Sequence, residues 1–65
     1  MNAYTLDDMI ACAEREVGMR RRVYPHWVAS KKMSQARADE EIAKMQAIAN
    51  HLRAQRDQNP TELFP

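Results

Sequence analysis

Glycine is nearly absent from this sequence, with Gly18 as the one example among 65 residues. The chain is instead rich in alanine, arginine, glutamate, glutamine and methionine, all of which are good helix formers. Strands have little support in such a composition, and a chain of this length holds one domain at most. We therefore predict a small all-α protein.

Cysteine is equally scarce, because Cys12 is the only one in the chain. An intramolecular disulfide is excluded, which leaves a reduced thiol, our preferred interpretation, or a bridge to another chain. In an antiparallel hairpin Cys12 is able to approach His51, but a structural zinc site normally requires four ligands. We accordingly predict no metal site and no cofactor.

Catalysis has no more support than metal binding. Nucleophilic catalysis by Cys12 needs an oriented base, an oxyanion hole and a concave pocket, which two helices hardly enclose. We predict that the protein is not an enzyme and that it acts by binding another macromolecule.

Large aromatic side chains are few, with one Phe, one Trp and two Tyr, so the hydrophobic core is expected to be thin. A lone hairpin of this size usually needs a disulfide, a metal or a second chain for its stability. Since neither a disulfide nor a metal site has support in the sequence, we expect a second chain to supply the additional stability. We predict a homodimer in which two hairpins share their apolar stripes as a four-helix bundle.

The sequence shows no marked excess of either charge and no long hydrophobic run. Ten Lys and Arg residues stand against nine Asp and Glu, a net charge of +1, which is atypical of DNA-coating proteins and of acidic DNA mimics. No apolar run approaches the length of a secretory core or a membrane span. We expect a cytoplasmic protein that has no membrane partner.

The first helix is predicted over residues 6–29. Thr5 is a favourable N-cap, and the acidic residues Asp7 and Asp8 suit the positive end of the helix dipole. The residues that follow repeat at spacings of four and three, which places them on one face of a helix. This stripe consists of Leu6, Ile10, Ala13, Val17, Arg20, Tyr24 and Trp27.

Two residues interrupt this helical pattern. Pro25 has no amide hydrogen to donate to the preceding turn, so it either kinks the helix or starts a new segment, and we expect a bend near Tyr24 and Pro25. Gly18 weakens a helix interior. It either lets another backbone approach closely or is tolerated on a solvated face.

The second helix is predicted over about residues 35–56, after Ser34 as its N-cap. Because the connection around residues 30–33 is short and polar, the two helices are expected to pack as an antiparallel hairpin. Asn59 and Pro60 are expected to stop the helix, and residues 57–65 to form a flexible tail. The apolar stripe of the second helix consists of Ala38, Ile42, Met45, Ala49 and Leu52, widened by Ile48.

The one local concentration of charge is a run of three arginines, Arg20, Arg21 and Arg22. Consecutive helical residues point about 100° apart, so the three do not share a face, and Glu16 is placed to pair with Arg20 one turn away. With Lys31 and Lys32 the run is able to grip phosphates. The balanced overall charge instead favours a solvated or protein-facing role, with nucleic-acid binding as the alternative.

The most distinctive segment is residues 24–28, which combines the only Trp with a helix-distorting proline. Trp, Tyr and Arg are enriched in binding hot spots, so we predict Tyr24, Trp27 and the three arginines as partner-binding residues. The alternative is that Tyr24 and Trp27 close the loop end of the hairpin over Met33 and Ile42. Both interpretations hold if Trp27 is half-buried.

Two segments carry a resemblance to known proteins: EREVGMRRRVYPHWVA at residues 14–29 and KMSQARADEEIAKMQAI at residues 32–48. The chain resembles short helical proteins encoded by bacteriophages and prophages, over roughly residues 5–54. The resemblance rests on the Arg run, the Tyr-Pro-x-Trp-Val turn and the Met-Ser-Gln cap, and it carries over no catalytic residue. It implies a phage setting, in which small early proteins often bind and redirect a host enzyme or defence complex.

We therefore expect a phage-type accessory protein that binds and modulates or inhibits a host protein of nucleic-acid metabolism or defence, in the host bacterial cytoplasm. One alternative is a nucleic-acid-binding module that uses the arginine run, which a steep fall of affinity with salt would favour. The other is a purely structural homo-oligomer. An interaction screen that returns no partner other than the protein itself would favour that one.

Overall fold

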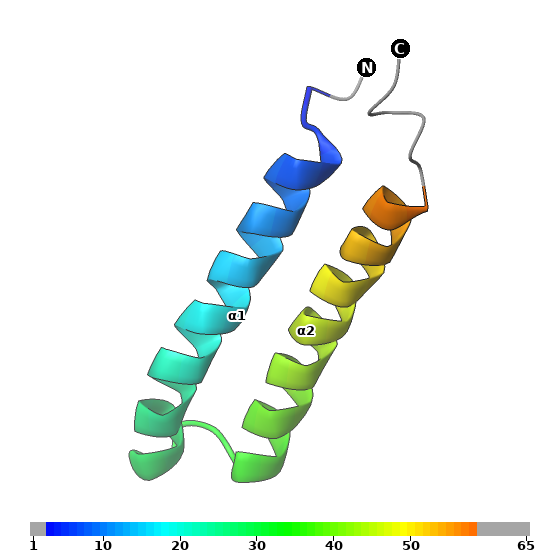
Figure 1. The fold of residues 1–65 in the computed structure, drawn as a ribbon. Coiled ribbons are helices and arrows are strands. Elements are labelled where there is room, and N and C mark those ends of the chain that lie inside the picture. Colours follow the sequence, from blue (N-terminus) through cyan, green and yellow to red (C-terminus); the bar gives the residue numbers. More distant parts are fainter. Residues whose placement is uncertain (1–2, 59–65) are drawn as a thin grey trace.

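The computed structural model describes residues 3–58, which form two helices, α1 (Leu6–Ala29) and α2 (Gln35–Asp57). The helices lie side by side and run antiparallel, so both ends of the described chain lie at the same end of the hairpin (Figure 1). No strand occurs within residues 3–58. The prediction of an all-α antiparallel hairpin is confirmed, and α2 ends one residue later than expected. Most of the predicted tail, residues 59–65, lies outside the described residues.

Both helices begin at hydroxyl N-caps, as the sequence predicts. The Thr5 hydroxyl accepts a hydrogen bond from the Asp8 amide at 3.0 Å, and the Asp8 carboxylate accepts one from the Thr5 amide at 3.2 Å, which together make a capping box. The Ser34 hydroxyl accepts from the Arg37 amide at 3.0 Å. These bonds satisfy amides that have no partner within the helix, and so they fix where each helix begins.

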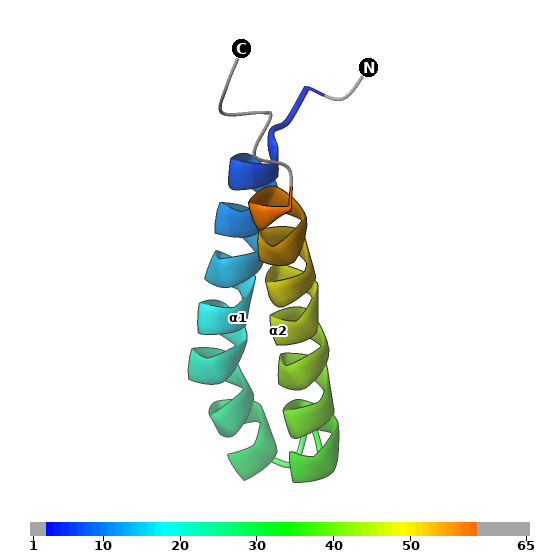
Figure 2. The ribbon, with the colours of Figure 1, turned by 45° about the vertical axis from the view of Figure 1, so that its right-hand side comes forward.

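Helix α1 continues through Pro25 to Ala29, so the proline does not start a new segment. Figure 2 shows that the last turns of α1 run in a different direction from its first turns, which agrees with the predicted bend at a proline. Gly18 is exposed, and a Cβ built there would meet no atom within 4 Å. Of the two alternatives for this glycine, tolerance on a solvated face is the one that the structure supports.

A Schellman motif ends α1 and turns the chain toward α2. The Lys32 amide donates to the Trp27 carbonyl at 2.9 Å, and the Lys31 amide donates to the Val28 carbonyl at 3.0 Å. Lys31 has a φ of 64°, in the left-handed region that usually takes glycine at this position. The Ser30 hydroxyl also donates to the Trp27 carbonyl, at 3.2 Å, so the backbone of Trp27 is held from two sides.

Replacing Lys31 by Gly is expected to stabilise the hairpin, because glycine adopts a positive φ without the steric cost that a Cβ imposes, about 1 kcal/mol. For a domain of this size that gain raises Tm by roughly 4–8 °C. Thermal unfolding followed by circular dichroism measures it, with Lys32→Gly as the matched control, since among residues 3–58 only Lys31 has a positive φ. An equal rise of Tm in both variants, or a lower Tm in Lys31→Gly than in the wild type, would contradict the assignment of strain to Lys31.

The core between the helices is thin, as the scarcity of large aromatics predicts. Helix α1 buries Ile10, Ala13, Val17 and Tyr24, whereas α2 buries only Ala38 and Ala49. Because alanine has a small side chain, α1 packs directly against the surface of α2 at these two positions, where the alanines are 2% and 0% exposed. The larger apolar residues of the α2 stripe, Ile42, Met45 and Leu52, are only partly buried.

Candidate binding surface

The two helices meet along two edges of the hairpin, and the first of these is polar. Asp7, Glu14 and Arg21 recur every seven residues on α1, so they lie on the same side of that helix. Each contacts a polar residue of α2. The pairs are Asp7 with Arg56 at 2.9 Å, Glu14 with Arg53, and Arg21 with Gln46 at 3.4 Å. We call this side the polar edge.

The opposite side, which we call the apolar edge, consists of Met9, Cys12, Met45, Ile48 and Leu52. These residues line an open groove of about 280 Å³ between α1 and α2, together with Ala13 and Glu16. Ile48 is 49% exposed and Cys12 is also exposed, while the other three residues of the edge are partly buried. Polar contacts therefore close one edge of the hairpin, and the other leaves hydrophobic side chains open to solvent.

Arg20 joins the two helices next to Glu16, on the side of the groove that is nearer the loop. Its Nε donates to the Glu16 carboxylate at 3.0 Å, as the spacing of the two residues predicts, and its Nη1 donates to the backbone carbonyl of Glu41 at 2.8 Å. The guanidinium also lies 5.9 Å from the centre of the Tyr24 ring, a cation–π distance. With a side chain only 20% exposed, Arg20 is engaged in holding α1 against α2.

Replacing Arg20 by Ala is expected to cost about 2 kcal/mol of folding free energy, because the change removes two charge-assisted hydrogen bonds that are partly buried. A loss of that size lowers Tm by roughly 10 °C in a domain this small. Urea unfolding measures it against Arg22→Ala, a control in the same arginine run whose side chain is exposed. Equal losses in the two variants would show that Arg20 has no special role in the fold.

Charged side chains continue from Arg20 along the first half of α2. Lys44 pairs with Glu40 at 2.9 Å and with Glu41 at 3.4 Å, and Arg37 pairs with Glu41 at 3.6 Å. The hydrogen bond from Lys44, and then its charge, hold the pKa of Glu40 below the ordinary value of a glutamate. We call Glu16, Arg20, Arg37, Glu40, Glu41 and Lys44 the charged cluster. It holds three acidic and three basic side chains, so it carries no large net charge.

Trp27 is the large aromatic residue that the hairpin presents to solvent near the loop. Its indole stacks on the ring of Tyr24, with the ring centres 5.4 Å apart and the planes at 26°. Tyr24 is buried at 9% exposure, whereas Trp27 is 42% exposed. The two interpretations of this segment are therefore compatible, since Tyr24 belongs to the core and Trp27 rests on it with much of its surface exposed.

The structure divides the five residues predicted to bind a partner. Arg20 and Trp27 each contact the ring of Tyr24, and Arg20 and Tyr24 are engaged within the fold. Arg21 lies on the polar edge beside Gln46, and Arg22 is exposed on α1 away from α2. The three arginines thus point in different directions, as the helical geometry predicts. Trp27, Arg21 and Arg22 are the exposed members of the set.

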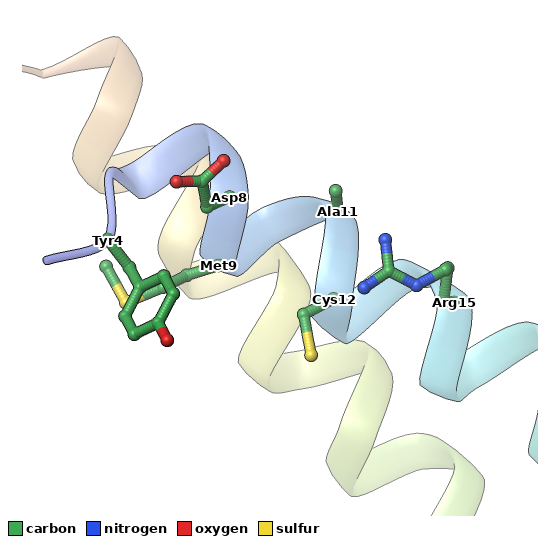
Figure 3. Close-up of a pocket in the computed structure, with 6 residues that line it drawn as sticks. All are labelled: Tyr4, Asp8, Met9, Ala11, Cys12 and Arg15. Carbon is green, nitrogen blue, oxygen red and sulfur yellow. The ribbon is translucent and has the colours of Figure 1, made fainter.

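A shallow hollow on α1 adjoins the apolar edge (Figure 3). Met9 and Cys12 line both the hollow and the groove, and Tyr4, which is 68% exposed, extends the apolar surface toward the start of the chain. Asp8 and Arg15 form its polar side. Met9 and Cys12 were not predicted to lie on an exposed surface, although Met9, Cys12 and Glu16 follow the spacings of three and four beside the main stripe.

Within residues 3–58, no group of three or more His, Cys, Asp or Glu side chains is arranged to hold a metal ion, and Cys12 and His51 are both exposed. Neither of the two described helices is both long enough and apolar enough to cross a membrane. No protein-family model matches the chain, and neither a curated protein nor a solved structure is significantly similar to it.

Proposed function

We propose that this protein is a small accessory protein that binds another protein, with Trp27 as the anchor of the contact. The observation that carries the proposal is a tryptophan that is 42% exposed while it stacks on a buried tyrosine. Tryptophan is enriched among residues that dominate binding energy, because its large ring fills a pocket on the partner and is fully desolvated there.

The surroundings of Trp27 favour binding because they hold the indole in place before a partner arrives. The Tyr24 ring supports one face of the indole, and Arg20 in turn packs against Tyr24. The carbonyl of Trp27 accepts hydrogen bonds from Lys32 and Ser30, which fix the backbone that carries the indole. A side chain fixed in this way loses little conformational entropy on binding, which increases affinity.

A host bacterial protein is the partner class that we propose, in line with the resemblance of residues 14–29 and 32–48 to short phage and prophage proteins. The protein would then modulate or inhibit that host protein in the bacterial cytoplasm. The proposed targets are enzymes of nucleic-acid metabolism and components of host defence.

The alternative, nucleic-acid binding by the arginine run, has weaker support. Arg20 donates its hydrogen bonds to Glu16 and Glu41, and Arg21 and Arg22 point in different directions. A phosphate-binding surface needs several cations on one face, together with a strong overall positive charge. The net charge of +1 is too small to provide that positive charge.

A capture experiment separates the two candidates. The immobilised full-length protein is incubated with bacterial lysate, with and without nuclease, at low and at high salt. We expect the same host protein to be retained after nuclease treatment, with moderate salt dependence. Loss of capture after nuclease treatment, combined with a steep fall of affinity with salt, would instead favour nucleic-acid binding.

A further inference from the structure

The apolar edge is a second surface, separate from Trp27, that nothing in residues 3–58 covers. Met9 and Cys12 on α1 face Met45, Ile48 and Leu52 on α2 across the groove. A helix of a packed bundle buries an apolar stripe that faces more than one neighbour, whereas among the described residues each helix has a single neighbouring helix. We infer that this edge binds a second copy of the same chain, so that two hairpins pair edge to edge.

The thin core is the first argument for a second copy. The six buried residues of the hairpin include three alanines, and none of the methionines or leucines in residues 3–58 is buried. Small domains with so little buried surface usually gain stability from another chain. The half-buried Met9, Met45 and Leu52 and the exposed Ile48 lie together at the edge, where a second hairpin would cover all four at once.

The pairing of charge at the groove is the second argument, because it allows two identical surfaces to meet. The one ionisable carboxylate that lines the groove, Glu16, is already paired with Arg20. The edge therefore presents no charge that requires an opposite charge on a partner. An uncharged surface is able to pair with an identical surface, whereas a charged one would repel its own copy.

Position along the hairpin is the third argument. The apolar edge occupies the half nearest the chain ends, and the charged cluster occupies the half nearest the loop, with Glu16 at the boundary between the two. In a two-fold symmetric pair the same patch lies on both sides of the axis. With the axis through the middle of the edge, near Cys12 and Ile48, the two charged clusters lie at opposite ends of the dimer, outside the contact, and keep their exposure to solvent.

Sedimentation of the full-length protein tests the inference, through a pair of variants that add the same charge at neighbouring positions. Ile48→Glu places the charge on the apolar edge, and Ala47→Glu places it on an exposed face of α2 that points elsewhere. We expect the wild type to sediment at twice the chain mass of 7.6 kDa. We expect the dimer of Ile48→Glu to be at least about thirtyfold weaker, as for a hot-spot residue, and that of Ala47→Glu to be unchanged.

Cys12 gives a second test that changes no apolar side chain. A short bismaleimide is expected to join two wild-type chains through Cys12, whose thiol is free and lies on the edge. The matched control moves the single thiol to the other side of α2, in a Cys12→Ala, Ala43→Cys variant, because Ala43 is exposed and lies away from the groove. Far less covalent dimer is expected from that variant.

Two results would overturn the inference. One is a wild type that remains monomeric at about 100 μM, a concentration at which micromolar association is saturated. A Leu63→Ser, Phe64→Ser variant that becomes dimeric would then identify the chain's own C-terminal segment as the occupant. The other is a dimer that Ile48→Glu does not weaken and that is cross-linked through Cys12 no more than through the cysteine of the Ala43→Cys variant. Such a dimer uses a different surface.

Discussion

Replacing Ala49 by Asp is expected to unfold the hairpin, whereas the same replacement at Ala47 is expected to leave it folded. Ala49 is 0% exposed, at the place where α2 packs against α1, and Ala47 is exposed on the same helix. A carboxylate at position 49 must either enter the contact between the helices without a partner or push them apart. Burial of an unpaired charge costs at least about 3 kcal/mol, a large part of the stability of a small domain.

Circular dichroism and urea unfolding of the two variants measure this difference. The Ala47→Asp control carries the same loss of helix propensity, so its cost is expected to stay below about 1 kcal/mol. Retained helix and similar unfolding midpoints in the two variants would contradict the packing of α2 on α1 at Ala49.

The positions of both helices were predictable because local chemistry sets them. Thr5 and Ser34 supply hydroxyl groups to the first free amides of each helix, and the scarcity of glycine leaves few competing turns. The end of α1 at Ala29 was predicted correctly, but the motif that forms this end was not. Its Schellman motif places Lys31 at a positive φ, where sequence rules look for glycine.

The side-by-side packing was harder to predict in detail, because residues of the same stripe differ in their exposure to solvent. Trp27 belongs to the same predicted stripe as Ile10 and Val17, yet the chain turns toward α2 soon after it, and its ring remains 42% exposed. Ile48 was assigned to a widened core stripe and is instead 49% exposed. Periodicity identifies a face of a helix, but it does not say how far the neighbouring helix reaches across that face.

The roles of the arginines also depend on contacts that sequence spacing does not contain. The pairing of Arg20 with Glu16 follows from their spacing of four residues, but its hydrogen bond to the Glu41 carbonyl joins residues 21 positions apart. Only the packed hairpin shows that Arg20 serves the fold while Arg22 remains exposed. The division of the chain into a polar and an apolar edge has the same origin.

Replacing Trp27 by Ala is expected to weaken partner binding by roughly thirtyfold, which corresponds to about 2 kcal/mol for a hot-spot residue. The change removes the exposed indole and leaves Tyr24, Arg20 and the edges of the hairpin in place. Lys44→Ala is the matched control, because Lys44 is exposed on α2 and pairs with Glu40 and Glu41 of its own helix. Its effect on affinity is expected to be small.

The dissociation constant of the captured host protein, measured by calorimetry for the wild type, Trp27→Ala and Lys44→Ala, tests the proposed function most directly. Circular dichroism first establishes that both variants keep the helix content of the wild type, and Trp27→Leu, which retains an apolar contact with Tyr24, replaces Trp27→Ala if that variant loses helix. The proposal predicts a roughly thirtyfold weaker complex for the Trp27 variant and near wild-type affinity for Lys44→Ala. A folded Trp27 variant that binds the host protein as tightly as the wild type would contradict it.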